Sequence, residues 1–139
     1  MTPEERAALL ALAEPDRLTE LADACLAGGG RPRVLVGPEV GCVVAQVREP
    51  IMRERFLLGD VLACRAEVEL DGVRGWAMRL GGDREAVLAA AILDAEVAAG
   101  RPGAARVLAL CHETAARQQE QANAEWAELA PTIVEFEEL

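Results

Sequence analysis

The sequence predicts an α+β fold: a single domain with a small antiparallel sheet of three to four strands, packed with N-terminal helices and two C-terminal helices, the last one long. Near both ends of the chain, apolar residues recur at three- and four-residue spacing, which is typical of amphipathic helices. From residue 61 to 70 apolar and polar residues alternate, as in a strand with one buried face. Asp71-Gly72 follows and indicates a hairpin, because a type I′ turn needs positive φ at both positions.

We expect one domain over residues 1–139, with a helical segment at 1–30, the sheet at 33–81, helices at 83–130 and a tail at 131–139. Two short helices are predicted at 3–13 and 16–27, divided at Pro15 because a proline restricts the residue before it. Residues 33–36 and 39–48 are rich in valine and predict short strands.

The hairpin formed by residues 61–70 and 73–80 has two possible registers. A two-residue turn at Asp71-Gly72 would pair Glu67 with Trp76 and would place Trp76, Met78 and Leu80 on the face opposite the core. A bulged turn would shift the register by one residue and move Trp76 into the core, because a shift of one turns every side chain to the other face. The Asp-Gly pair favours the two-residue turn.

Two helices are predicted after the sheet. Asp83 is a natural N-cap for the first, and Gly100 and Pro102 end it. The second should run from about residue 104 to 130, with Pro131 preventing its continuation. Its second half has few apolar residues, so we expect it to pack on another chain through Trp126 and Phe136.

Composition excludes several classes of protein. The chain has 139 residues, 52% of them hydrophobic, and a net charge of −10. Disordered chains are less hydrophobic, and proteins that bind nucleic acids or anionic membranes carry an excess of positive charge. The longest uncharged runs are too short to span a bilayer, and no signal peptide is evident. We therefore expect a cytoplasmic protein that binds neither nucleic acid nor membrane.

No catalytic, cofactor-binding or metal-binding set is predicted. The four cysteines form no Cys-x-x-Cys pair. His112 lies between Cys111 and Glu113, and adjacent residues on a helix point in different directions. The densest charged patch is residues 48–60, where Arg48, Arg53 and Arg55 could bind an anion. The alternative is a charged loop whose glutamates neutralise the arginines.

An ordered set of short motifs resembles the PhnG family, the G subunit of the bacterial carbon–phosphorus lyase system. The motifs are Glu54-Arg55-Phe56-x-x-Gly59-Asp60, Arg65-Ala66, Asp71-Gly72-x-x-Gly75, Leu80-Gly81-x-Asp83 and Asp94-Ala95. The resemblance covers residues 41–96 with good spacing and extends more weakly to both ends. The sequence departs from the family pattern at Cys64, Arg84 and Ile133.

The resemblance implies a non-catalytic subunit that assembles with the H, I and J subunits in two copies each. With the I, H and L subunits it would support transfer of a phosphonate onto the ribose of ATP with loss of adenine. It also makes a second copy of the chain a candidate partner within the assembly. The candidate interface residues are Glu54, Arg55, Phe56, Gly59, Asp60, Arg65, Trp76, Met78, Trp126 and Phe136.

Two other hypotheses remain open at this point. One is a stand-alone enzyme or binding domain for an anionic ligand at Arg48, Arg53 and Arg55, although no convergent base or nucleophile accompanies these arginines. The other is a free-standing homodimeric ligand-binding domain.

Overall fold

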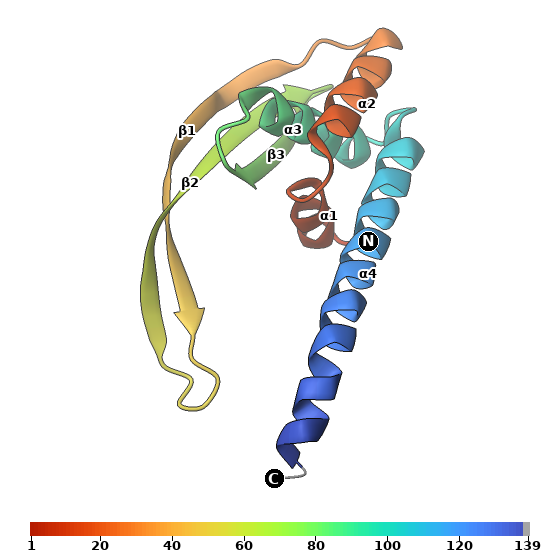
Figure 1. Ribbon diagram of the computed structural model, residues 1–139. Helices are drawn as coiled ribbons and strands as arrows, with labels where there is room; N and C mark the ends of the chain where they lie inside the picture. Colours follow the sequence, from red (N-terminus) through yellow and green to blue (C-terminus); the bar gives the residue numbers. More distant parts are fainter. Residues whose placement is uncertain (138–139) are drawn as a thin grey trace.

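A computed structural model describes the backbone of residues 1–137 and the side chains of residues 1–130. The described part is α+β, as predicted (Figure 1). Its elements in chain order are α1 (Pro3–Leu10), α2 (Pro15–Ala27), β1 (Arg33–Arg48), β2 (Arg55–Leu70), β3 (Val73–Leu80), α3 (Arg84–Ala98) and α4 (Ala104–Glu137). Figure 1 shows a helical body beside one end of the sheet, from which a long β1–β2 hairpin and the distal part of α4 extend.

The sheet is antiparallel in the order β1-β2-β3. Asp71 and Gly72 have φ values of 51° and 78°, as a type I′ turn requires. Leu70 pairs with Val73, and Glu67 pairs with Trp76. The two-residue turn is therefore confirmed, and Trp76 lies on the face opposite the core with 40% of its surface exposed.

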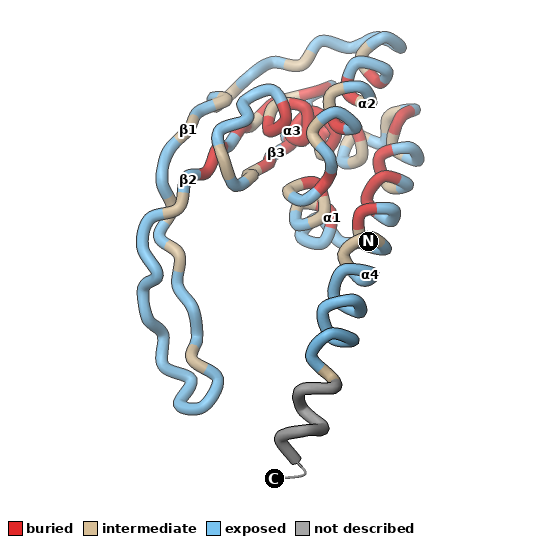
Figure 2. The backbone as a smooth tube through the Cα atoms, viewed as in Figure 1, coloured by how far each residue is buried: buried red, intermediate tan, exposed pale blue. Residues whose placement is uncertain are grey.

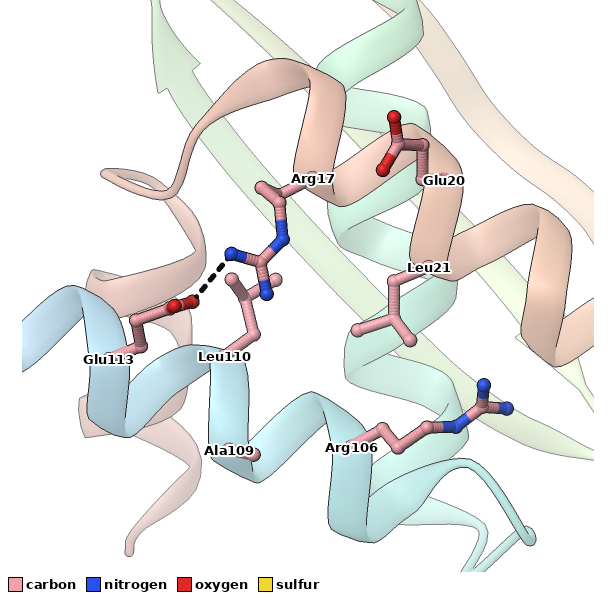
Figure 3. A pocket seen from close by; sticks show the side chains of 7 residues that line it. All are labelled: Arg17, Glu20, Leu21, Arg106, Ala109, Leu110 and Glu113. Carbon is pink, nitrogen blue, oxygen red and sulfur yellow. Dashed lines mark ion pairs between the residues drawn. The ribbon is translucent and has the colours of Figure 1, made fainter.

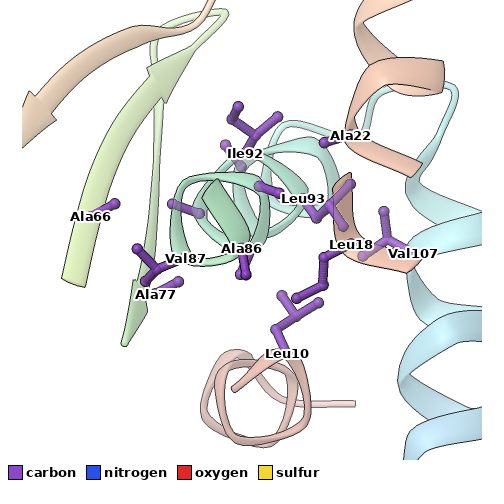
Figure 4. Close-up of a cluster of buried hydrophobic side chains, with 14 of the residues drawn as sticks. Leu10, Leu18, Ala22, Ala66, Ala77, Ala86, Val87, Ile92, Leu93 and Val107 are labelled. Carbon is purple, nitrogen blue, oxygen red and sulfur yellow. The ribbon is translucent and has the colours of Figure 1, made fainter. Parts of the chain in front are cut away.

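The core forms around α3, which packs on one face of β2 and β3 (Figure 4). Small residues allow this packing to be close. A Cβ atom at Gly75 would overlap the carbonyl oxygen of Ala91 and lie 2.5 Å from the backbone nitrogen of Ala95. Leu10, Leu18 and Val107 bring α1, α2 and α4 to the other side of α3, and all three are fully buried.

Local capping residues set where the helices begin. Thr2 and Glu5 form a capping box at α1, in which each side chain accepts a hydrogen bond from the other residue's backbone N–H. The Asp83 carboxylate accepts from the backbone N–H of Ala86 at 3.0 Å, as predicted for the N-cap of α3. α2 starts at Pro15, a residue favoured at the first helical position.

Charged side chains connect α1 to the sheet and to α3. Asp94 accepts from the Nε of Arg6 at 2.7 Å and from the backbone N–H of Trp76 at 2.9 Å. The Arg79 guanidinium donates to the carbonyl oxygens of Leu10 and Ala13 at 2.6 and 2.8 Å. These carbonyls lie at and just beyond the end of α1, so Arg79 satisfies groups that a helix terminus leaves unpaired. Burial lowers the pKa of Arg79.

The first two strands are longer than predicted. Segments 33–36 and 39–48 form one strand, β1, whose pairing with β2 is irregular between Val34 and Glu39. The charged patch at 48–60 was interpreted as a loop, but β2 already begins at Arg55. In the alternation of residues 61–70 Leu62 shares a face with Cys64, but Leu62 is 49% exposed whereas Cys64 is buried, so the buried face does not extend along the whole of β2.

The prediction that α4 ends before Pro131 was wrong, because the helix continues to Glu137. Proline inside a helix removes one backbone hydrogen bond and strains the preceding turn, which weakens a helix without always ending it. We also expected the long C-terminal helix to be the least buried element. That was wrong, because β1 contains no buried residue, whereas the first part of α4 does. Val107, Leu110, Cys111 and Thr114 are its last buried residues, and residues 119–129 are all exposed (Figure 2).

Candidate functional site

The residues predicted as an interface lie in three places. Glu54, Arg55, Phe56, Gly59 and Asp60 are all exposed near the end of the β1–β2 hairpin. Arg65, Trp76 and Met78 lie on the outer face of the sheet, within the body. Trp126 lies on the distal part of α4 and is 63% exposed, whereas the side chain of Phe136 lies outside the described residues.

Residues 41–62, which we call the arm, contain no buried residue (Figure 2). The two strands of the arm pair with each other from Cys42 opposite Leu62 to Arg48 opposite Arg55. At the base of the arm, the carbonyl oxygen of Leu62 also accepts a hydrogen bond from the backbone N–H of Gly81 at 2.9 Å. Large apolar side chains of the arm are exposed by 39% to 90%, namely Val44, Val47, Ile51, Met52, Phe56, Leu57, Leu58 and Leu62. Exposed apolar patches of this kind mark interaction sites in soluble proteins.

The distal part of α4 is a second extension. Arg117 forms its last described link to the body, donating to the carboxylate of Glu14 at 2.9 Å and to the carbonyl oxygen of Leu12 at 3.0 Å. Beyond it, Trp126 and Leu129 are 63% and 56% exposed. A helix without tertiary contacts is marginally stable in water, so this segment is suited to packing against another surface.

An apolar groove of about 540 Å³ lies between α1 and β3. Trp76, Met78 and Leu80 line one side, and Ala8 and Leu12 line the other. Arg65 lies outside this groove, where its Nε donates to the Glu39 carboxylate at 2.5 Å. The sheet therefore brings Trp76 and Met78 together in the groove. Arg65 lies directly opposite Met78 in the β2–β3 pairing, and it forms an ion pair with Glu39 of β1.

A second cavity, of about 440 Å³, lies between α2 and α4 (Figure 3). Its charged residues are Arg17, Glu20, Arg106 and Glu113, and its floor is apolar. Arg17 is neutralised by Glu113 at 2.8 Å. The cavity thus combines balanced charges with an apolar floor and has no nucleophile beside a base among its lining residues.

The cysteines and acids of the described chain do not converge on a metal site. Among the described residues, no group of three His, Cys, Asp or Glu side chains could hold a metal ion. Cys25, Cys64 and Cys111 are buried, and burial raises the pKa of each of these thiols. A raised pKa keeps a thiol protonated at neutral pH and unreactive as a nucleophile. Cys42, on the arm, is exposed.

The arm was not predicted as a structural unit. Arg48, Arg53 and Arg55 lie at its tip, which is a tight turn between two strands. The uncharged run from residue 40 to 47 and the apolar run from 56 to 58 were the available signals, because two such segments facing each other across a turn predict a hairpin. The charged residues between these two segments favoured a loop, so the pairing of the two strands was not predicted.

The comparisons with known proteins agree with the resemblance in the sequence. The described helices include none that is long and apolar enough to cross a membrane. A search among curated proteins found no match. The family model described as "Phosphonate metabolism protein PhnG" matches residues 2–139, which is nearly the whole chain. The match includes the arm, the groove and both ends of α4, and the chain therefore belongs to the PhnG family and has a role in phosphonate metabolism.

Proposed function

We propose that the chain is a non-catalytic accessory subunit of the carbon–phosphorus lyase core assembly. With the I, H and L subunits it supports the transfer of a phosphonate such as methylphosphonate onto the ribose of ATP. Adenine leaves, and the product is α-D-ribose 1-methylphosphonate 5-triphosphate. The direct partners are subunits of the H, I and J types in the cytoplasm, where the four free cysteines would stay reduced.

The observation that carries the proposal is the pair of extensions from a small body. The arm and the distal part of α4 together carry ten of the fifteen large apolar side chains that are exposed in the described chain. Exposed apolar surfaces of this kind favour aggregation unless a partner covers them, and they are therefore not expected on a protein that acts as a monomer. A subunit of a stable assembly requires them.

The types of side chain that line the cavities and the arm tip support an accessory role. The catalytic step needs groups that stabilise the leaving adenine and position a phosphonate near the ribose. The groove beside α1 and the cavity between α2 and α4 contain no acid–base pair in contact with a nucleophile among their described lining residues. The arginines at the arm tip stand on an exposed hairpin. The chemistry is therefore assigned to the partner subunits.

The test is co-purification. A tagged copy of the chain is expressed in cells grown on methylphosphonate as sole phosphorus source, and the captured proteins are identified by mass spectrometry. We expect stoichiometric recovery of H-, I- and J-type subunits. The complex, but not the chain alone, should release adenine from ATP when methylphosphonate and the L subunit are present. A monomer that turns over a phosphonate by itself would overturn the proposal.

A further inference from the structure

The arm tip, which we define as residues 48–58, places like charges side by side. Arg48 lies directly opposite Arg55 in the β1–β2 ladder. Like charges at directly opposite positions destabilise an antiparallel pair. Arg53 follows in the turn between the strands, with φ of 56°. A sequence that keeps three arginines at one exposed turn needs an outside source of negative charge to offset them.

The glutamates of the tip do not supply that charge. The Glu49 carboxylate turns inward, where its two oxygens accept from the backbone N–H groups of Ile51 and Met52 at 2.7 and 2.6 Å. The backbone N–H of Glu49 donates to the carbonyl oxygen of Glu54 at 2.8 Å, which closes the turn. The Glu49 carboxylate is thus used within the turn itself, and no ion pair joins it to the arginines of the tip among the described residues.

No arginine of the tip forms an ion pair or side-chain hydrogen bond with the described residues. Six arginines elsewhere in the chain do form ion pairs, namely Arg6, Arg17, Arg33, Arg65, Arg101 and Arg117. The contrast is unexpected in a chain of net charge −10, where carboxylates are abundant. Arg31, Arg74, Arg84 and Arg106 of the body also form no ion pair with the described residues. At the tip, however, three such arginines lie within residues 48–55, on a hairpin that extends from the body (Figure 1).

The arm tip also contains the most exposed large apolar side chain of the described chain. Ile51 is 90% exposed, Met52 is 72% exposed, and Phe56, Leu57 and Leu58 follow on β2. A site for a small oxyanion needs donors that converge, and it has no need of large apolar side chains beside them. Arginine together with large apolar side chains is instead the composition of the residues that dominate protein–protein binding.

We propose that the arm tip docks into an apolar pocket, rimmed by carboxylates, on another subunit of the assembly. Ile51 and Met52 enter the pocket, and Arg48 and Arg55 pair with carboxylates at its rim, where guanidinium–carboxylate hydrogen bonds are strong and directional. The positive tip also steers association with an acidic surface, although the whole chain is acidic. This inference rests on the proposed function, because it requires a partner subunit.

The experiment is competitive assembly. Wild-type chain and a differently tagged variant are co-expressed with the H-, I- and J-type subunits, and the ratio of the two chains in the purified complex is measured. We expect the ratio of the double variant R48E/R55E to wild type in the complex to fall by roughly 30-fold or more, which is the effect of removing a binding hot spot. The incorporation of R48Q/R55Q should fall by less than that of R48E/R55E, and its assembly should depend less on salt concentration than that of wild type. The incorporation of I51S/M52S should also fall, while the salt dependence of its assembly should match that of wild type.

The matched control is R31E/R84E, which changes two exposed arginines of the body and shifts the net charge equally. It should compete within about threefold of wild type, since surface charges away from an interface contribute little. Melting curves of the isolated variants should coincide with wild type, because every altered side chain is exposed. Equal competition by R48E/R55E and the control would overturn the inference and leave the proposed function standing.

Two further results would also overturn it. One is self-association of the isolated chain that R48E/R55E abolishes, which would identify the occupant as a second copy. The other is binding of inorganic phosphate or tripolyphosphate that R48Q/R55Q abolishes without changing assembly, which would make the tip a small-anion site. Failure of the wild-type chain to recover any partner subunit would instead count against the proposed function.

Discussion

Arg101 donates from its Nε to the buried carboxylate of Glu96 at 2.7 Å. The second carboxylate oxygen accepts from the backbone N–H of Gly103 at 2.9 Å. Arg101 continues to the Asp71 carboxylate at 2.6 Å and to the carbonyl oxygen of Gly29. One guanidinium group, through two ion pairs and a hydrogen bond, therefore connects the end of α3, the β2–β3 turn and the loop after α2. These contacts of Arg101 link three parts of the body, and none of them involves the arm or the distal part of α4.

Glu96→Ala should destabilise the isolated chain. The substitution leaves the buried N–H of Gly103 without an acceptor, which costs about 1–3 kcal/mol, and loss of the Arg101 contact adds to that. Urea unfolding measures the effect. Arg17→Ala is the control, since it breaks the exposed Arg17–Glu113 pair and should cost at most about 1 kcal/mol. Equal effects of the two variants would show that the Glu96 network contributes nothing special.

Gly75→Ala should be more damaging than its size suggests. The added methyl group would overlap the carbonyl oxygen of Ala91, so β3 and α3 must separate. Overpacking of this kind costs typically 1–3 kcal/mol. Gly41→Ala is the matched control, because Gly41 also lies in a strand and a Cβ atom there meets nothing within 4 Å. Thermal melts of the two variants should differ by many degrees, with Gly41→Ala close to wild type.

Trp76→Ala should weaken assembly more than it lowers the stability of the isolated chain. The side chain is 40% exposed in the groove beside α1, so its removal should cost well below the roughly 3–5 kcal/mol of a buried tryptophan. Denaturant unfolding of the isolated variant and competitive assembly measure the two effects. A full core-sized loss of stability with normal assembly would assign Trp76 to the body alone.

Removal of residues 119–139 should leave the body folded and impair assembly. The cut keeps Thr114, which is buried, and Arg117, which holds Glu14. Removal from residue 112 onward would delete both and would confuse loss of binding with loss of folding. The truncated chain should melt at the temperature of the full chain, while its incorporation into the complex should fall. Full incorporation would show that the distal part of α4 has no essential contact.

The parts of the fold predicted correctly have causes within a few residues. Asp71-Gly72 determines the turn and hence the side of the sheet on which Trp76 lies, and Asp83 determines where α3 begins. The length of the arm depends instead on pairing between residues far apart, such as Val44 with Asp60. The sequence between them is charged at the turn, so local pattern indicated a loop.

The candidate site was predictable only in part for a related reason. Phe56 was identified through the family motif, Trp76 through the register of the hairpin, and Trp126 through the few apolar residues of the last helix. The opposition of Arg48 and Arg55 could not be predicted, because it follows from the strand register. Continuation of α4 past Pro131 was likewise missed, because the cost of a proline in a helix can be offset by the rest of the helix.

Stability should fall at alkaline pH through the buried thiols. Burial raises the pKa of Cys25, Cys64 and Cys111 in the folded chain, and the negative charge of Glu96 adds to the effect at Cys25. Unfolded cysteine loses its proton near pH ~8.5. Above that pH the unfolded chain binds fewer protons than the folded one, so the free energy of unfolding decreases as pH rises. Below it, these thiols leave stability unchanged.

This chain makes the measurement unusually clean, because it contains neither lysine nor tyrosine. Cysteine and the N-terminal amine are therefore its main titrating groups between about pH 8 and pH 11. Urea midpoints should be flat from pH 7 to pH 8 and should decline above about pH 8.5. Cys64→Ala should reduce the slope of that decline, because it removes one buried thiol. Cys42→Ala, which removes an exposed thiol instead of a buried one, is the matched control. Identical slopes in both variants would show that a group other than the buried thiols controls alkaline stability.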